Sequence, residues 1–185
     1  MGKIRILESE HYSLRKLTMD DAAEVFEILS DPGIVKYLNL EAPKNLSDAQ
    51  KIVAEYLEAY RAGTKYPFAI VSRGNGMFLG VLLLKVDLYD EDCFEYTAYV
   101  KRDFQGRGVL SEVFPLMLSF AFEEVGTGNV RGFIKQGNEA SAKLCRKNKM
   151  LLEKIFDVPG IPEKIESYLM TRERYNNLLA GTQKK

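Results

Sequence analysis

The stretch from Tyr99 to Ser111, Tyr-Val-Lys-Arg-Asp-Phe-Gln-Gly-Arg-Gly-Val-Leu-Ser, constrains the fold more than any other part of the chain. It begins at the end of a β-type run, residues 93–100, and leads into an apolar stretch, residues 109–125, with helical spacing. The pattern therefore predicts a strand that feeds a helix through a glycine-punctuated loop. Gly106 and Gly108 have no Cβ, so the backbone there can take unusual dihedral angles and let a ligand approach closely.

The same loop has the features of a phosphate site. The amides from Gln105 to Val109 would point out of the start of the expected helix, where the peptide dipoles add partial positive charge. Arg102 and Arg107 flank the loop and could pair with further phosphate oxygens. The sequence excludes a P-loop, which needs Gly-x-x-x-x-Gly-Lys-Ser/Thr, and the dinucleotide fingerprint, whose third glycine is missing after Gly108. A Gly-x-Gly at this place can also be a tight turn only, and both interpretations stay open here.

Length and composition predict one domain over residues 1–185. The chain has 46% hydrophobic and 28% charged residues, which is ordinary for a globular protein. Lys plus Arg and Asp plus Glu both number 26, so no global charge draws the protein to nucleic acid or to an anionic membrane. Two cysteines are too few for a disulfide framework, and the N-terminus has no signal-peptide pattern. We therefore expect a cytoplasmic protein that binds neither nucleic acid nor membrane.

The periodicity of the remaining chain predicts a mixed α/β protein. Strands are expected at 12–16, 68–72, 77–86, 93–100, 129–134, 151–158 and 164–171, and helices at 19–29, 47–62, 109–125 and 138–148, with a short helical turn at 34–38. Thr18 with Asp21 and Ser47 with Gln50 have the spacing of capping boxes at two helix starts. The tail from about residue 176 is expected to fray.

The motif Gln105-x-x-Gly108 at the start of a helix resembles the acetyl-CoA pyrophosphate loop of the GNAT superfamily of acetyltransferases. That loop continues with one residue and then Gly or Ala, where this chain has Leu110. The predicted order of strands and helices is also the order of a GNAT fold. The resemblance implies a central, mostly antiparallel mixed sheet of about seven strands, flanked by helices and splayed at the fourth strand.

Further motifs are similar to the branch that includes the ribosomal-protein alanine N-acetyltransferases, the RimJ/RimL-like branch. The matching segments are residues 13–22 with 30–32, 94–100, 105–108, 138–141 and 169–174, in the branch's order and spacing. Two positions depart from the pattern. Lys149-Met150 replaces the Gly-Phe pair that usually follows the Asn-x-x-Ser helix, and Pro115 interrupts the central helix, which predicts a kink.

The resemblance implies acetyl-CoA as cosubstrate, no metal, and a set of cofactor-binding residues. These are Tyr99, Val100, Lys101, Arg102, Gln105, Gly106, Arg107, Gly108, Val109, Leu110, Asn138 and Ser141. The backbone amides of Tyr99 to Lys101 would bind the pantetheine arm and the thioester carbonyl. Asn138 would bind the cofactor's amide arm, although an Asn before a helix also serves as an N-cap, and both roles can coexist.

Three residues are candidates for catalysis. Glu95 matches a frequent family glutamate and could take the proton of the attacking amine through a water, although it could instead be an ordinary exposed strand residue or a salt-bridge partner. The proton donor for the thiolate is open between Ser141 and Cys145, which stands where many members have Tyr. Ser141 could instead only cap its helix, and Cys145 could instead be a small buried apolar residue.

The sequence therefore predicts an acetyl-CoA-dependent N-acetyltransferase acting on a primary amine by direct attack in a ternary complex. The acceptor stays open between a protein N-terminus, an antibiotic, a polyamine and a metabolite, and a homodimer stays open as well. The alternative is a GNAT-fold module that binds CoA as a sensor or scaffold without turnover. Nucleotide-phosphate transfer would need a metal-binding acidic motif near the loop, which the sequence lacks.

Overall fold

The computed structural model describes residues 5–38, 40–88 and 90–182. Backbone contacts group the chain into two compact units, each described by itself below. Unit 1 comprises residues 1–85 and 96–117, and unit 2 comprises residues 86–95 and 118–185. Strand β5 (Cys93–Val100) begins in unit 2 and continues into unit 1, so it contributes residues to both.

Unit 1 is built on antiparallel strands. They are β1 (Leu7–Glu8), β2 (Tyr12–Lys16), β3 (Lys65–Ser72) and β4 (Phe78–Val86), followed in the sheet by β5. Leu14 pairs with Ile70, and Ala69 with Val81, in the two central ladders. Most of β3 and β4 is buried, which explains why these strands read as continuous apolar runs rather than as alternating ones.

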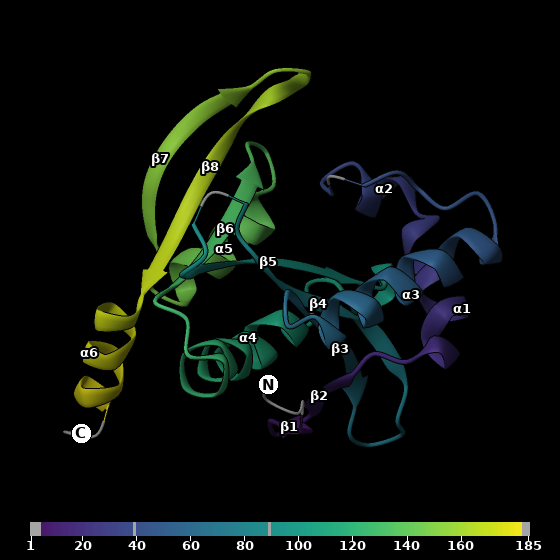
Figure 1. Ribbon diagram of the computed structural model, residues 1–185, viewed down its shortest axis with the longest axis horizontal. Coiled ribbons are helices and arrows are strands. Elements are labelled where there is room, and N and C mark those ends of the chain that lie inside the picture. The colour runs from purple at the N-terminus through teal and green to yellow at the C-terminus, as the bar shows by residue number, and fades with distance from the viewer. Residues whose placement is uncertain (1–4, 39, 89, 183–185) are drawn as a thin grey trace. The chain divides into compact units, whose positions relative to one another are not determined.

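Helices α1 (Ala22–Leu29) and α3 (Leu46–Arg61) pack together beside β3 (Figure 1). A 3₁₀ turn, Met19–Asp21, precedes α1, and a short helix, α2 (Pro32–Val35), follows it. The predicted capping box at Thr18 and Asp21 is confirmed, and the Thr18 amide donates to Asp21 Oδ2 at 2.8 Å. The predicted start of α3 at Ser47 is wrong. The Asn45 side chain accepts from the Asp48 amide at 3.0 Å, so the helix begins two residues earlier than Ser47 would allow.

The buried carboxylate of Asp21 connects the end of β2 to the start of α1. Arg15 donates to both of its oxygens, at 2.6 and 2.8 Å. Burial by itself would raise the pKa of Asp21, but the hydrogen bonds from Arg15 and Thr18 outweigh it and lower the pKa. The ionised side chain therefore ties strand β2 to the start of α1.

Unit 2 contains the first residues of β5 together with β6 (Asn129–Lys135), β8 (Ile161–Thr171) and β7 (Leu151–Val158), adjacent in that order. β6 runs parallel to β5 and antiparallel to β8, and β7 is antiparallel to β8. Helix α5 (Glu139–Lys147) follows β6, and α6 (Arg172–Thr182) follows β8 (Figure 1). β7 has the predicted bounds, whereas β8 starts three residues before the predicted Lys164.

The structure differs from the sequence-based predictions in the C-terminal tail and in the number of strands. The tail expected to fray from about residue 176 is helical to Thr182, and residues 183–185 lie outside the described residues. Across the described chain the strands follow the order β1-β2-β3-β4-β5-β6-β8-β7, eight instead of about seven. The additional strand, β1, has two residues, which is too short to show a periodicity. The mixed α/β class with a mostly antiparallel sheet is confirmed.

The central helix α4 (Val109–Ser119) contains Pro115 and continues past it as a π-helical segment, Phe120–Val125. Gly126, with φ of +87°, ends this segment. The change of pitch thus comes five residues after the proline at which the sequence predicts a kink. No helix within the described ranges is both long and apolar enough to cross a membrane.

Candidate active site

The predicted phosphate loop lies in unit 1 between β5 and α4. A 3₁₀ turn, Arg102–Phe104, follows the strand, and Gly106 and Gly108 then take φ values of +73° and +84°. Both glycines are in the left-handed region that side chains disfavour, which explains the residue type at these positions. In the part of the chain that the structure describes, the amides of residues 106–108 donate no backbone hydrogen bond. They stand directly before an 11-residue helix, so the loop offers donors and a positive dipole end to an anion.

Side chains around the loop hold its backbone in place. Gln105 Nε2 donates to the Val100 carbonyl at 3.1 Å, so this side chain returns to the end of the strand. The Lys101 amide donates to the Leu79 carbonyl of β4 at 2.8 Å. That amide, one of those predicted to face the pantetheine, is therefore already used within the protein.

The cations beside the loop have different partners. Lys101 Nζ lies 2.5 Å from Glu24 and 2.8 Å from Glu27, both on α1. Burial opposes the charge of Lys101, but its hydrogen bonds to these carboxylates raise its pKa. Arg102 makes a two-contact ion pair with Asp31, with Nε 2.7 Å from Oδ2.

Arg107, by contrast, is exposed, and its guanidinium lies 5.5 Å from the centre of the Phe104 ring. The two arginines predicted to flank a phosphate are therefore not equivalent. Arg102 is engaged with a carboxylate of unit 1, whereas Arg107 can turn to a ligand by giving up a surface contact with an aromatic ring. Val109, at the start of α4, is buried, and Leu110 is half-buried.

Gly80 is a structural determinant of this site that the sequence reading missed. A Cβ at this position would lie 2.9 Å from the Val100 Cα and would overlap the Tyr99 carbonyl oxygen. The strands β4 and β5 can approach so closely only because residue 80 is glycine. Its place inside the apolar run Phe78–Leu84 was the signal, because an isolated glycine in a strand marks a bulge or a close backbone approach.

Tyr99 and Val100, at the end of β5, are both buried. The Tyr99 ring belongs to the core that α1 and α3 form in unit 1, with Tyr56 of α3 in the same cluster. Its hydroxyl is buried in this core, beside Tyr56. Burial, and secondarily the neighbouring Tyr56, raises the pKa of Tyr99 well above its usual value, so the phenol is neutral at physiological pH.

Glu95, the predicted general base, lies in unit 2 on β5 and is half-buried. It forms the last rung of the parallel ladder between β5 and β6, in register with Arg131. This ladder covers three residues of each strand, Cys93–Glu95 and Asn129–Arg131. The short ladder agrees with the expectation that the sheet opens at this strand.

The α5 residues also belong to unit 2. Asn138 is the N-cap of α5, and its Oδ1 accepts from the Ser141 amide at 3.3 Å, so the predicted capping role is confirmed. Ser141 is half-buried, whereas Cys145 has no exposed surface. Full burial is what the alternative of a small buried residue predicts for Cys145. The structure thus brings residues 99–110 together in unit 1, and Glu95, Asn138, Ser141 and Cys145 fall in unit 2.

The end of α5 shows the conformational cost of one departure from the family pattern. Lys149 has φ of +63° and is the one described residue other than glycine with a positive φ. The family's usual Gly-Phe pair would put glycine at this left-handed position, where a Cβ is unfavourable. The Lys149 carbonyl accepts from Arg174 Nε at 2.6 Å, which links the turn to α6.

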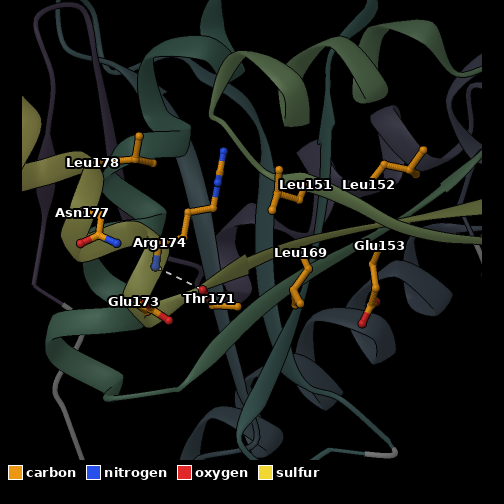
Figure 2. Close-up of a pocket in the computed structure, with 9 residues that line it drawn as sticks. All are labelled: Leu151, Leu152, Glu153, Leu169, Thr171, Glu173, Arg174, Asn177 and Leu178. Carbon is orange, nitrogen blue, oxygen red and sulfur yellow. Dashed lines mark hydrogen bonds between the residues drawn. The ribbon is translucent and has the colours of Figure 1, made fainter.

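The described residues contain no group of three or more His, Cys, Asp or Glu side chains that could hold a metal. Unit 2 has an open groove of about 540 Å³ between β7, β8 and α6. Figure 2 shows Arg174, Asn177 and Leu178 on its α6 side and Leu151 and Leu169 on the sheet side. A second groove, in unit 1, is lined by residues that include His11, Arg73, Phe104 and Arg107.

Comparison with known proteins agrees with this geometry. Residues 12–151 match the family described as acetyltransferase (GNAT) domain. An uncharacterized N-acetyltransferase of Bacillus subtilis (strain 168), YoaA, is 22% identical over 156 residues, which cover 84% of this chain and 85% of YoaA. The chain therefore belongs to the GNAT acetyltransferase family and is an acetyl-CoA-dependent N-acetyltransferase.

Two solved structures share the fold at low identity. The ribosomal L7/L12 alpha-N-protein acetyltransferase RimL, in complex with coenzyme A, has a TM-score of 0.80 and 14% identity, with 92% of this chain and 99% of RimL covered. The spermidine N-acetyltransferase of Vibrio cholerae, in complex with CoA and spermine, has a TM-score of 0.77 and 14% identity, with 89% and 97% covered. At this identity the two likenesses show a shared fold.

Proposed function

We propose that this protein transfers the acetyl group of acetyl-CoA to a primary amine by direct attack in a ternary complex, with Glu95 as the general base. The observation that carries the proposal is the loop of unit 1. Gly106 and Gly108 are left-handed, and the amides of residues 106–108 point to no backbone acceptor at the start of α4. Such amides fit the pyrophosphate of CoA, and Arg107 is the exposed cation that can add a further contact.

Acetyl-CoA supplies an activated thioester when bound. Glu95 accepts the proton of the amine through a water as the amine nitrogen forms its bond to the thioester carbonyl carbon. Amides near the end of β5 support the carbonyl oxygen while it carries negative charge. When the carbon–sulfur bond breaks, the leaving sulfur needs a proton. Ser141 is half-buried and Cys145 fully buried, so Ser141 is the better candidate of the two for donating it.

The names of the fold relatives support an amine as the acceptor. RimL is named for a protein α-amine and the Vibrio cholerae enzyme for spermidine, so both relatives modify amines of very different size. We propose a primary amine as the shared chemistry and test the two kinds of acceptor separately.

The first experiment measures thiol release from acetyl-CoA with a panel of polyamines, amino sugars and N-terminal peptides, together with calorimetric titration of CoA. We expect CoA binding and amine-dependent release of CoA thiol. Saturating CoA, at about 100 times its Kd, should add roughly 2.7 kcal/mol to the free energy of unfolding. Binding without turnover on any amine would instead support the sensor or scaffold alternative, and a melting curve unchanged by CoA would contradict both.

The second experiment replaces Glu95 by Gln. Loss of a general base typically lowers kcat by about 10² to 10⁴, while CoA affinity should stay the same because the side chain keeps its size. The effect should shrink as the pH rises toward the pKa of the amine, since the substrate then arrives deprotonated. Glu163→Gln, at an exposed position of β8, is the matched control. Full activity of Glu95→Gln across this pH range would remove Glu95 from the mechanism.

A further inference from the structure

A network of charged side chains in unit 2 surrounds the rung that carries Glu95. Arg131, the register partner of Glu95, has a side chain that is only 14% exposed. Its Nη1 donates to Asp87 Oδ2 at 2.9 Å, and its Nε lies 3.3 Å from Glu153 Oε2. The Asp87 side chain is 2% exposed, so both members of this pair are withdrawn from water.

The network ties together segments that are far apart in the sequence. Asp87 directly follows β4, Arg131 lies on β6, and Glu153 lies on β7, where it is one of the residues lining the groove in Figure 2. Ser167 of β8, which is fully buried, donates to Glu153 Oε2 at 2.9 Å and fixes that carboxylate. One guanidinium therefore holds two carboxylates that come from opposite sides of its strand.

The chemistry of the arginine suits this task. Its guanidinium is planar, always charged and presents several N–H donors in a fixed arrangement, whereas a lysine ammonium is a point charge on a flexible stem. Burial opposes the charge, yet the hydrogen bond to Asp87 and the surrounding anions raise the pKa of Arg131 further. A buried, charged and multiply bonded group has few alternative positions, so the rung that contains it is rigid.

This rung is the last one before β5 continues beyond the ladder. Residues in register on parallel strands point to the same face of the sheet, and neighbouring strands lie about 4.8 Å apart. The side chains of Glu95 and Arg131 therefore project from the same face of the sheet on adjacent strands. A general base must lie within hydrogen-bond reach of the proton or of a bridging water, and a misplacement of about 1 Å can lower a rate by about 10².

We propose that Arg131 is a positioning residue for acetyl transfer, which acts through Glu95 by locking the Glu95–Arg131 rung between Asp87 and Glu153. The inference rests on the proposed role of Glu95 as the base. It assigns to Arg131 no contact with acetyl-CoA or with the amine. Its loss should therefore affect kcat rather than the affinity for CoA.

The test compares Arg131→Lys with Arg146→Lys, since Arg146 is another arginine of unit 2 bonded to a tyrosine and a glutamate. We expect Arg131→Lys to lower kcat by about 10-fold or more, with the Kd of CoA changed by less than about threefold. Arg146→Lys should leave both nearly unchanged. The decisive readout is the double variant Glu95→Gln/Arg131→Lys, which should be hardly slower than Glu95→Gln alone, because residues that act as a unit are not additive.

If Arg131→Lys does not fold, the milder variant Glu153→Gln tests the same proposal. Glu153→Gln keeps the size of the side chain and its ability to accept from Ser167, and it removes one of the two anions that hold Arg131. It should lower kcat by a smaller factor, with the same lack of additivity in the Glu95→Gln background. Turnover by the wild type and its loss in Glu95→Gln establish the proposed function separately. With those in hand, fully additive losses, an unchanged kcat or a parallel loss of CoA affinity would overturn the role of Arg131.

Discussion

The loop of unit 1 and the Arg131 network of unit 2 use different functional groups: backbone amides in the loop and charged side chains in the network. In the loop, the functional groups are backbone amides, the glycines are exposed, and the conformation depends on left-handed φ values at residues 106 and 108. In the network, the functional groups are side chains that are largely withdrawn from water and bonded to one another across three strands. A loop made of amides tolerates changes of neighbouring side chains, whereas a buried charge network is sensitive to each member.

The difference explains why the two regions respond to different substitutions. An amide cannot be mutated, so the loop is disturbed by adding a Cβ at one of its left-handed positions or by displacing β4 from β5. The network, in contrast, fails when one partner is removed, because the remaining buried charge has no compensation.

Gly80→Ala should have the largest effect, because the added Cβ overlaps the Tyr99 carbonyl and must displace β4 from β5. We expect a loss of about 3 kcal/mol or more in the free energy of unfolding, at the upper end of overpacking effects. Gly74→Ala, whose Cβ would meet nothing closer than Ser72 Oγ at 3.9 Å, is the control and should be nearly neutral. Denaturant unfolding measures both. A stable Gly80→Ala protein with intact CoA binding would show that the loop does not depend on this approach.

Gly108→Val tests the loop itself against a matched position. Gly108 and Gly160 have φ of +84° and +83°, and a Cβ at either would meet nothing within 4 Å. Both substitutions should therefore cost a similar free energy of unfolding, about 1–2 kcal/mol, from the backbone alone. Only Gly108→Val should weaken CoA binding, by about 10-fold or more, because it crowds the amides at the start of α4. Equal affinities of the two variants in calorimetry would reduce the loop to a structural turn.

Lys149→Gly should stabilise the protein, which is unusual for a substitution that removes a side chain. The left-handed φ of Lys149 costs conformational free energy for a residue with a Cβ, whereas glycine adopts it without that cost. We expect a gain of about 1 kcal/mol, which corresponds to a rise in Tm of about 2–4 °C for a chain of this size. Lys149→Ala, which keeps the Cβ, should show no such gain. A fall in Tm on Lys149→Gly would mean that the lysine side chain itself supports the turn.

The buried thiol of Cys93 makes stability depend on pH in the alkaline range. Burial raises the pKa of the Cys93 thiol from 9.0 to about 12. Because the folded state holds the proton more tightly than the unfolded state, the contribution of this thiol to stability is complete below pH 9.0 and is lost as the pH rises toward about 12. The unfolding free energy of Cys93→Ala should therefore decrease less steeply with pH over this range than that of the wild type. Denaturant titration at several pH values measures both. Identical pH slopes for the variant and the wild type would contradict the buried, neutral thiol.

Features that depend on neighbouring residues were predictable from the sequence. The bounds of β5 and β7, the N-cap at Asn138 and the loop after Val100 were all predicted where the structure has them. Each depends on a pattern within a few residues, such as alternation, a cap or a glycine that can take a positive φ. The predicted roles of Glu95, Ser141 and the loop residues remain predictions, with the structural places now assigned.

Contacts between residues far apart in the sequence could not be predicted from local patterns. Arg102 pairs with Asp31, 71 positions away, so the sequence could not show that this arginine is engaged with a carboxylate. Arg131 is 44 positions from Asp87 and 22 from Glu153, and only the strand order β5-β6-β8-β7 brings the three together. Gly80 likewise meets the Tyr99 carbonyl only across a ladder. Local conformational propensity depends on adjacent residues. Ion pairs and close backbone approaches depend instead on the pairing register of the strands, which is fixed when the sheet forms.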